Sequence, residues 1–452
     1  MEVGQGCTDE ISYLPWWSSL SLALNKFKAK VVGLAKKVKK VGKDDPRRVV
    51  HSFKVGFALS LVSLFYYISA LFAGFRTSAI WAVLTVVVVM EYTVGGTLSK
   101  GLNRTFATLL AAALGVGAHQ IAILAGEKGE PFLLGLFVFL LAAAATFSRF
   151  IPEIKARYDY GVTIFILTFS LVAVSSNRTV DAFELLQLAH QRISTIVIGV
   201  AICLLTSVFI CPVWAGEDLH KLVAANLEKL ASFLEGLGEV YFGDKVGGER
   251  MESKCFPQAY KSVLNSKSNE ESLANLARWE PGHGHFGFRH PWKQYLKVGA
   301  LSRQCAYSME ALMSYITTNE RTQTPADLEL RKMISSTCKE MSIECGKALK
   351  ELAASIGTMT TPGVCRHNIA IAAATTTLKA SLSEEGIPSM ILETAITASL
   401  LSQVVQCVPQ IVASVEELAR LAQFRDCETL HKATVKPLTE GGSPGVVITV
   451  ME

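Results

Sequence analysis

Six apolar blocks lie between residues 55 and 213, and they constrain the fold of this chain more than any other feature. A transmembrane helix needs about 20 predominantly apolar residues, with a range of roughly 17–25. Because lipid offers no partners for backbone polar groups, such a segment must form a helix that satisfies its own backbone. We therefore predict six membrane-spanning helices. They cover residues 55–72, 78–94, 106–123, 131–147, 160–174 and 193–213.

The second half of the chain has the composition of a soluble domain. Charged residues make up 18% of the whole chain, against roughly 25% in soluble proteins, and the deficit falls in the first half. Further on, Leu330, Ile334, Met341 and Cys345 recur at helical spacing. The predicted fold class is an all-α membrane protein with six transmembrane helices followed by a cytosolic α-helical domain. Its predicted parts are a basic cytosolic segment (1–50), the transmembrane domain (51–213), the cytosolic domain (214–435) and a disordered tail (436–452).

Lysine and arginine are unevenly distributed among the segments that flank the apolar blocks. Fifteen of them precede the first block or lie in alternate connections, whereas four lie in the opposite set. By the positive-inside rule the richer set faces the cytosol, so we predict that both chain ends are cytosolic. The richer set is Lys26, Lys28, Lys30, Lys36, Lys37, Lys39, Lys40, Lys43, Arg47, Arg48, Lys100, Arg104, Arg149, Lys155 and Arg157; the poorer set is Arg76, Lys128, Arg178 and Arg192.

A seventh apolar segment, residues 395–415, holds no charged residue. However, Ser399, Gln403 and Gln406 fall on one stripe at helical spacing, and Pro409 interrupts the segment. An amphipathic helix in a soluble bundle explains this pattern better than a seventh span does.

Three cations near the apolar blocks are candidates for an anion pathway. Lys100 and Arg104 are four residues apart at the start of the third block, and Arg192 opens the sixth. A cation within a membrane helix costs roughly 2.5–3.5 kcal/mol on insertion scales, so it usually faces a wet cavity or a partner. The alternative is that all three extend to lipid headgroups. Gly95-Gly96 and Gly101 predict irregular backbone at this approach, which is typical of a cavity lining and favours the pathway.

Arginine suits a carboxylate because its planar guanidinium donates two parallel hydrogen bonds. Rings of arginine and lysine also select for anions in pores. Lys155 and Arg157 either form the cytosolic mouth of such a pathway or serve only to set the topology.

Four carboxylates are candidates for gating or for binding external aluminium. Asp181 and Glu184 lie on the predicted outer side, where a hard cation would prefer carboxylate oxygens. They could equally begin an ordinary helix, where acidic residues are common. Glu270 and Glu271 lie in the predicted cytosolic domain, where they could pair with lysines.

The densest polar and aromatic cluster runs from Trp279 to Trp292. Glu280 and the histidines His283, His285 and His290 could hold zinc, but their spacing matches no known zinc motif. Glycines and prolines favour a structural loop instead, and metal binding stays open. The chain has no Walker A, GxSxG or HExxH motif, so we expect no enzymatic activity, no cofactor and no nucleic-acid partner.

Several motifs together resemble the plant aluminium-activated malate transporter family. They are DPRR at 45–48, WAVLTVVVVME at 81–91, TLSKGLNR at 97–104, YDYG at 158–161, CPVWAG at 211–216 and WEP at 279–281. The resemblance implies a homodimeric anion channel with six spans per subunit. It also implies malate as the favoured anion, with other organic and inorganic anions passing.

The resemblance implies roles for particular residues as well. Lys100, Arg104 and Arg192 would line the anion path, and the Trp279-Glu280-Pro281 motif would act in gating. The region around Phe209 resembles the part linked to inhibition by GABA. External aluminium would act as a further regulator.

Two departures from the family pattern bear on regulation. Gly282 and Gly287 stand where the family has arginines, so two cations that could affect docking of the cytosolic domain are missing. The first external loop, residues 71–78, holds no carboxylate, which weakens the prediction that aluminium activates the protein.

We therefore expect a malate-permeable anion channel in the plasma membrane, with the vacuolar membrane as the alternative location. The membrane potential is worth about 2.3 kcal/mol per charge per 100 mV, so efflux needs no coupled ion. Two alternatives stay open. One is a proton-coupled organic-acid exporter, for which Glu91 is the candidate titrating group. The other is a membrane-tethered scaffold whose activity resides in residues 214–452.

Overall fold

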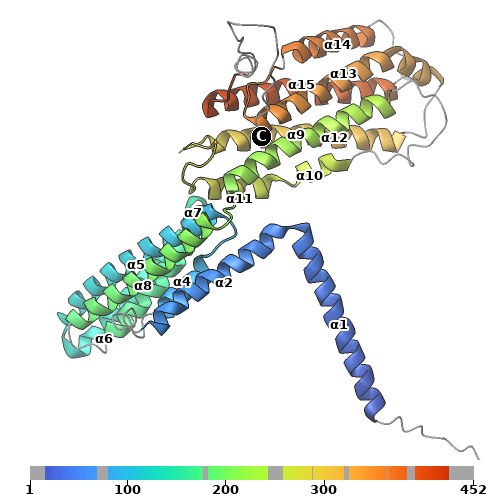
Figure 1. The fold of residues 1–452 in the computed structure, drawn as a ribbon. Coiled ribbons are helices and arrows are strands. Elements are labelled where there is room, and N and C mark those ends of the chain that lie inside the picture. Colours follow the sequence, from blue (N-terminus) through green and yellow to red (C-terminus); the bar gives the residue numbers. More distant parts are fainter. Residues whose placement is uncertain are drawn as a thin grey trace, which may run out of the picture. The chain divides into compact units, whose positions relative to one another are not determined.

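The computed structural model describes residues 16–68, 80–176, 182–242, 258–287, 289–319, 325–363, 365–383 and 392–426. In these ranges the chain is helical, and β pairing is confined to isolated bridges. An all-α membrane protein fits this architecture (Figure 1).

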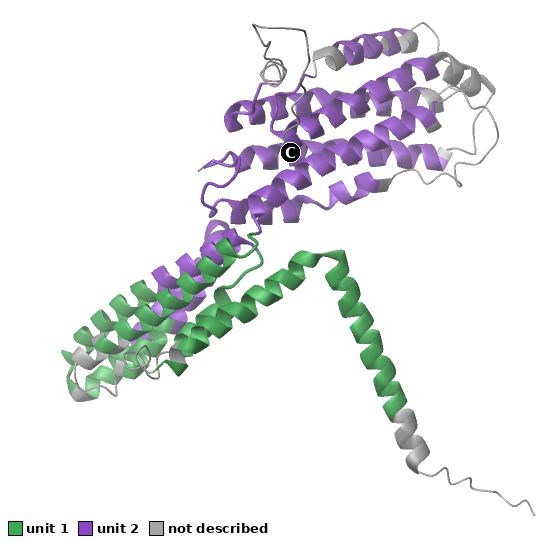
Figure 2. Cartoon of the chain, viewed as in Figure 1, with its two compact units in different colours: residues 1–92, 108–135, 168–212 green, residues 93–107, 136–167, 213–452 purple. Residues whose placement is uncertain are grey.

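The chain divides into two compact units, which we describe separately (Figure 2). Unit 1 comprises Met1–Tyr92, Thr108–Gly135 and Thr168–Pro212. Unit 2 comprises Thr93–Ala107, Leu136–Leu167 and Val213–Glu452. The boundary therefore crosses three of the long apolar helices, α5, α6 and α7.

Unit 1 is built around three helices that pack on one another. Its core contains Ala58 and Val62 of α2, Val86 of α4, and Ile196 and Cys203 of α8. The helices of the apolar half are α1 (Trp16–Asp44), α2 (Pro46–Tyr67), α4 (Ile80–Val89), α5 (Val94–Ile123), α6 (Gly126–Ser148), α7 (Pro152–Ser176) and α8 (Ala182–Phe209).

The start of α2 follows from its sequence. Asp45 has extended backbone, and its side chain accepts a hydrogen bond from the backbone N–H of Arg47 at 3.1 Å. Pro46 occupies the first helical position, where a missing N–H costs nothing.

Length and composition select five described helices that could cross a membrane. Four of them, in α5 to α8, coincide with the third to sixth predicted blocks. The first block lies partly on α2, and the second contains the shorter apolar helix α4. The ends of these two blocks at residues 69–72 and 78–79 lie outside the described residues, so the count of six spans stays a prediction.

The α6 helix shows the surface expected in lipid. Only 6% of the most apolar stretch of this helix is buried. The side chains of Phe132, Phe139 and Phe147 are between 68% and 82% exposed. In water so large a row of exposed aromatic rings would be strongly unfavourable. Lipid removes this cost.

The remaining helices form a bundle in unit 2. The long helices α9 and α13 pack together, as do α12 and α15, around an extensive apolar core. The predicted seam on α13 is confirmed at Ile334, Met341 and Cys345, which are all buried; the side chain of Leu330 lies outside the described residues. The elements are α9 (Ala215–Val240), η3 (Gln258–Tyr260), α10 (Lys261–Leu264), α11 (Lys267–Ala277), α12 (Trp292–Asn319), α13 (Pro325–Thr358), α14 (Cys365–Ser383) and α15 (Leu392–Ala422).

The fifth helix selected by composition, Ala395–Ala422, belongs to this bundle. Its apolar side chains, including Val404, Val408 and Ile411, are buried in the core shared with α12 and α13. Gln403 and Gln406 are exposed on the opposite stripe. This arrangement agrees with the predicted amphipathic helix.

Candidate functional site

Two of the predicted pathway cations, Lys100 and Arg104, lie in the N-terminal part of α5. The Thr93 hydroxyl accepts a hydrogen bond from the backbone N–H of Gly96 at 3.1 Å and caps the helix. The prediction of irregular backbone at Gly95-Gly96 and Gly101 is wrong, because all three lie in regular α-helix. Close packing explains Gly95 instead: a Cβ there would lie 2.4 Å from the carbonyl oxygen of Leu276.

Lys100 and Arg104 share one face of α5, as their spacing predicts, and both contact Tyr160 of α7. Arg104 Nη1 donates to the Tyr160 hydroxyl at 3.2 Å, and Lys100 Nζ lies 5.6 Å from the centre of the ring. Arg104 is only 3% exposed, whereas Lys100 is half-buried. Because a guanidinium stays protonated in proteins, this face of α5 keeps positive charge in largely apolar surroundings.

A polar contact ties α5 to the first turns of α7. Asn103 Nδ2 donates to the carbonyl oxygen of Arg157 at 2.9 Å. The predicted mouth residues, Lys155 and Arg157, are both exposed there. Burial and the nearby charge of Arg157 lower the pKa of Arg278, a cation that our reading of the sequence missed. Lys155 and Arg157 of α7 and Arg278 at the end of α11 therefore place three cations near the first turns of α7.

Arg192 lies in unit 1, in the first half of α8. Its guanidinium carbon lies 4.8 Å from the centre of the Trp81 ring on α4, a cation–π contact. The two helices approach closely at Gly199, where a Cβ would lie 2.9 Å from Thr85 Cβ. Because the two cations of α5 belong to unit 2, a pathway shared by all three stays a prediction.

Lys54 is a buried cation that we did not predict. It lies inside α2, is 2% exposed, and donates from Nζ to the carbonyl oxygen of Cys211 at 2.8 Å. Cys211 follows the end of α8 and has a φ of 43°. A lysine within an apolar helix is itself a signal for a functional or structural site. In the sequence Lys54 lies directly before the first predicted block, which begins at residue 55.

The carboxylate of Glu280 lies at the start of α9. Oε1 accepts a hydrogen bond from the backbone N–H of Ala215 at 2.6 Å, and Oε2 accepts one from that of Gly216 at 3.0 Å. These N–H groups have no partner within the helix, and the helix dipole favours a negative charge there. Glu280 is only 7% exposed. The middle residue of the Trp-Glu-Pro motif therefore holds the first helix that follows the apolar half.

Glu280 also contacts the start of α5. A Cβ at Gly95 would lie 2.9 Å from Glu280 Cγ, and the backbone of Val94 donates to the carbonyl oxygen of Val213 at 2.9 Å. Burial raises the pKa of Glu280, while backbone hydrogen bonds from Gly216, Ala215 and Gly95 oppose that rise. One carboxylate thus joins the N-termini of α5 and α9, and all of these residues lie in unit 2.

Aromatic contacts hold the motif in place. Trp279 meets Tyr158 of α7 edge to face, with ring centres 6.4 Å apart. His283 stacks on Trp214, with ring centres 3.8 Å apart. These contacts connect the loop on one side with the apolar helix α7 and on the other with the residue before α9.

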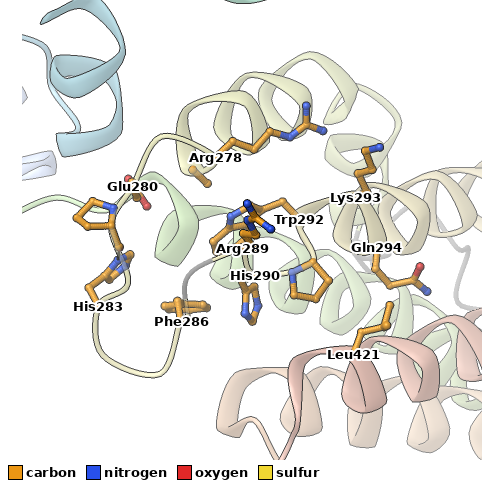
Figure 3. A pocket seen from close by; sticks show the side chains of 14 residues that line it. Arg278, Glu280, His283, Phe286, Arg289, His290, Trp292, Lys293, Gln294 and Leu421 are labelled. Atoms are coloured by element: carbon orange, nitrogen blue, oxygen red, sulfur yellow. Dashed lines mark hydrogen bonds between the residues drawn. The ribbon is translucent and has the colours of Figure 1, made fainter. Parts of the chain in front are cut away.

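A cavity of about 540 Å³ lies beside the motif. The cations Arg278, Arg289 and Lys293 and the ring of Trp292 line it (Figure 3). Gly287, one of the two departures from the family pattern, also lines it. An arginine at this position would add a fourth cation to the cavity wall.

The histidines of this region serve packing. His220 Nδ1 lies 2.9 Å from the Tyr295 hydroxyl, and His290 Nε2 lies 3.3 Å from the same hydroxyl. Burial lowers the pKa of both, that of His290 to about 4, so both are neutral near pH 7. Among the described residues, no group of three or more His, Cys, Asp or Glu side chains could hold a metal ion.

The acidic candidates are placed unequally. Asp181 and the side chain of Glu184 lie outside the described residues. Glu271 is exposed. Glu270 is fully buried and forms an ion pair with Arg303 of α12, so its predicted pairing with a lysine is wrong. The reason is that α11 turns Glu270 into the bundle.

Comparison with known proteins adds the following findings. The family model described as "Aluminium activated malate transporter" matches residues 39–394. "Aluminum-activated malate transporter 1" of Triticum aestivum is 53% identical over 418 residues, which cover 91% of this chain and 90% of that protein. "Aluminum-activated malate transporter 2" and "Aluminum-activated malate transporter 7" of Arabidopsis thaliana are 49% and 46% identical; each match covers 88% of this chain, and 79% and 84% of the respective relative.

Proposed function

This chain belongs to the aluminium activated malate transporter family, and we propose that it forms a channel through which malate and other anions cross a membrane passively. The observation that carries the proposal is Arg104. It is 3% exposed on α5, a helix long and apolar enough to span a bilayer. Family membership and the printed names of the relatives support malate as the substrate.

The cations of α5 suit a conduit for dicarboxylates. Arg104 offers a carboxylate two parallel hydrogen bonds, and Lys100 offers a second positive charge one helical turn away. Tyr160 contacts both. Several moderate sites allow an ion to leave again, whereas one strong clamp would retain it. A doubly charged anion gains about twice 2.3 kcal/mol per 100 mV of membrane potential, so passive efflux suffices.

The Trp-Glu-Pro motif has the contacts of a gating element. Glu280 bonds the first turn of α9 and approaches the first turn of α5, the helix that carries Lys100 and Arg104. A change in the cytosolic bundle that moved Glu280 would therefore act on α5 directly. Trp279 extends the connection to α7 through Tyr158.

The finer parts of the proposal concern assembly, location and regulation. They are a homodimer in the plasma membrane with both termini cytosolic, activation by external aluminium through Asp181 and Glu184, and inhibition by GABA near Phe209. The relatives' printed names support aluminium as a regulator. Several apolar helices support a location in a membrane.

Currents from oocytes loaded with malate test the proposal. We expect Arg104→Glu to abolish the anion current, because it reverses the charge that the anion meets, while Arg104→Lys keeps a reduced current. Lys267→Glu, at an exposed position on α11, serves as the matched control. Unchanged current and selectivity in Arg104→Glu, with the protein at the surface by biotinylation, would contradict the proposal. Currents that reverse at the Nernst potential of the anion at every pH would exclude coupled export through Glu91.

A further inference from the structure

The helix α1 carries a continuous apolar stripe on an exposed surface. The helix runs from Trp16 to Asp44, and the next residue, Asp45, caps α2. The stripe residues are between 46% and 66% exposed. They are Leu24, Phe27, Val31, Leu34, Val38 and Val41.

The opposite side of α1 is positively charged. At about 100° per residue the stripe residues fall within a sector of roughly 100°, and the lysines occupy the rest of the circumference. Asp44 is the single acidic residue in the helix. The lysines are Lys26, Lys28, Lys30, Lys36, Lys37, Lys39, Lys40 and Lys43.

A second copy of α1 is a poor partner for this stripe. The stripe residues alternate by three and four, which is the spacing of a coiled-coil seam. In that arrangement the positions that flank the seam between Leu24 and Val41 hold Lys28, Lys30 and Lys37 and no acidic residue. Flanking positions that pair well carry opposite charges, so this seam has no complementary charge for a second copy of itself.

A bilayer that contains anionic lipid satisfies both sides of α1. Amphipathic helices rich in lysine lie in the interface with the apolar face at the acyl-chain boundary. Polybasic segments next to a span attract anionic headgroups. The first predicted span begins at residue 55, about 15 Å of helix beyond the end of α1 at 1.5 Å per residue. The chain therefore holds α1 close to the membrane surface.

We propose that α1 lies on the membrane, with the stripe inserted at the acyl-chain boundary and the lysines on anionic headgroups. The headgroups are those of the leaflet from which α2 enters. The proposal rests on the proposed function only in assigning that leaflet to the cytosol. Bound in this way, α1 fixes the position at which the first span enters the bilayer.

Hydrogen exchange of the full chain in lipid nanodiscs tests the proposal. One nanodisc contains phosphatidylcholine alone, and the other contains phosphatidylcholine with about one third phosphatidylserine, enough for the surface attraction of basic segments. We expect amides 24–43 to exchange at least about tenfold more slowly in the anionic nanodisc. Raising the salt concentration should reduce this difference, because salt screens exposed charges. Peptides from α13 should not change.

Three variants separate the two faces. Lys36→Glu/Lys37→Glu/Lys40→Glu should remove the protection, because losing three surface contacts weakens partition on the order of a hundredfold. The matched control, Lys36→Arg/Lys37→Arg/Lys40→Arg, should keep it. Val31→Asp/Leu34→Asp should remove it with the lysines intact. Unchanged exchange of α13 peptides in each variant shows that the bundle is folded.

Equal exchange of amides 24–43 in the two nanodiscs would overturn the proposal. Protection of equal size in phosphatidylcholine or in detergent would overturn it too, since the stripe would then be covered by protein. The test is independent of the channel, because anion current is recorded separately. Protected amides without a malate current would refute the proposed function alone, and a current without protection would refute this proposal alone.

Discussion

Glu270 and Glu280 are two buried carboxylates of unit 2, ten residues apart, that are held in different ways. Glu270 is bound by side chains: the Ser266 hydroxyl donates to it at 2.7 Å, and Arg303 forms an ion pair with it. Glu280 is bound by backbone N–H groups at the start of α9. The first arrangement stabilises the interior of the bundle. The second connects the bundle to α5, so it can transmit a displacement to the helix that carries the cations.

Glu270→Ala should have the largest effect on stability. It leaves the guanidinium of Arg303, which is 13% exposed, without its buried partner. Loss of one member of a buried ion pair costs about 3–5 kcal/mol. The measurement is thermal unfolding of the detergent-solubilised full chain, with Glu271→Ala as the matched control on the exposed neighbour. An unchanged unfolding midpoint would show that Glu270 does not stabilise the bundle.

Glu280→Ala should destabilise the protein less and reduce the current more. The backbone N–H groups of Ala215 and Gly216 lose their acceptor, at a cost of about 1–3 kcal/mol. Local opening of α9 is measured by hydrogen exchange, and the malate current is recorded in parallel. Glu217→Ala, in the same turn of α9 but half-buried and paired with Lys221, is the control. A normal current in a variant with a loosened α9 would separate this contact from gating.

Gly95→Ala should act on the α5 side of the same connection. The added Cβ would meet the Leu276 carbonyl oxygen at 2.4 Å. We expect a stability cost toward the lower end of the roughly 1–3 kcal/mol typical of overpacking, because the end of α5 can shift. The shift should still lower the current. Gly117→Ala, in the same helix with open space around it, should leave the current intact; equal effects would contradict a special role for Gly95.

The smallest effect should be the pH dependence contributed by Glu280. Burial raises its pKa in the folded protein above the unfolded value of 4.5, so the folded state binds more protons between these two values. The stabilisation from this group is therefore complete below pH 4.5 and is lost as the pH rises through the folded value. Comparing the pH dependence of α9 hydrogen exchange in the wild type and in Glu280→Gln measures it. Identical slopes would contradict the shift.

The sequence predicted those features that depend on neighbours along the chain. Apolar blocks located α5 to α8, and a polar stripe placed α15 in the bundle. Hydropathy and helical period are local properties, so one sequence reveals them. The spacing of Lys100 and Arg104 likewise placed both on one face.

The contacts that make the candidate site depend on tertiary packing instead. Glu280 meets Ala215 across 65 residues, Arg104 meets Tyr160 across 56, and Lys54 meets Cys211 across 157. No local pattern encodes such pairs. Gly95 is a related case. The sequence predicted irregular backbone at this glycine, whereas the structure shows that a side chain here would clash with the backbone of Leu276.

The bond between Lys54 and Cys211 would restrict which helices can rearrange when the proposed channel opens. It joins the beginning of the first apolar helix to a residue just after the end of α8, and its Lys54 end is buried. A hydrogen bond in partly buried surroundings is stronger than one in water, so this bond favours movement of these two ends together. In the proposed channel, opening movements would then arise in α5 and α7, whose N-terminal turns contact Glu280 and Trp279.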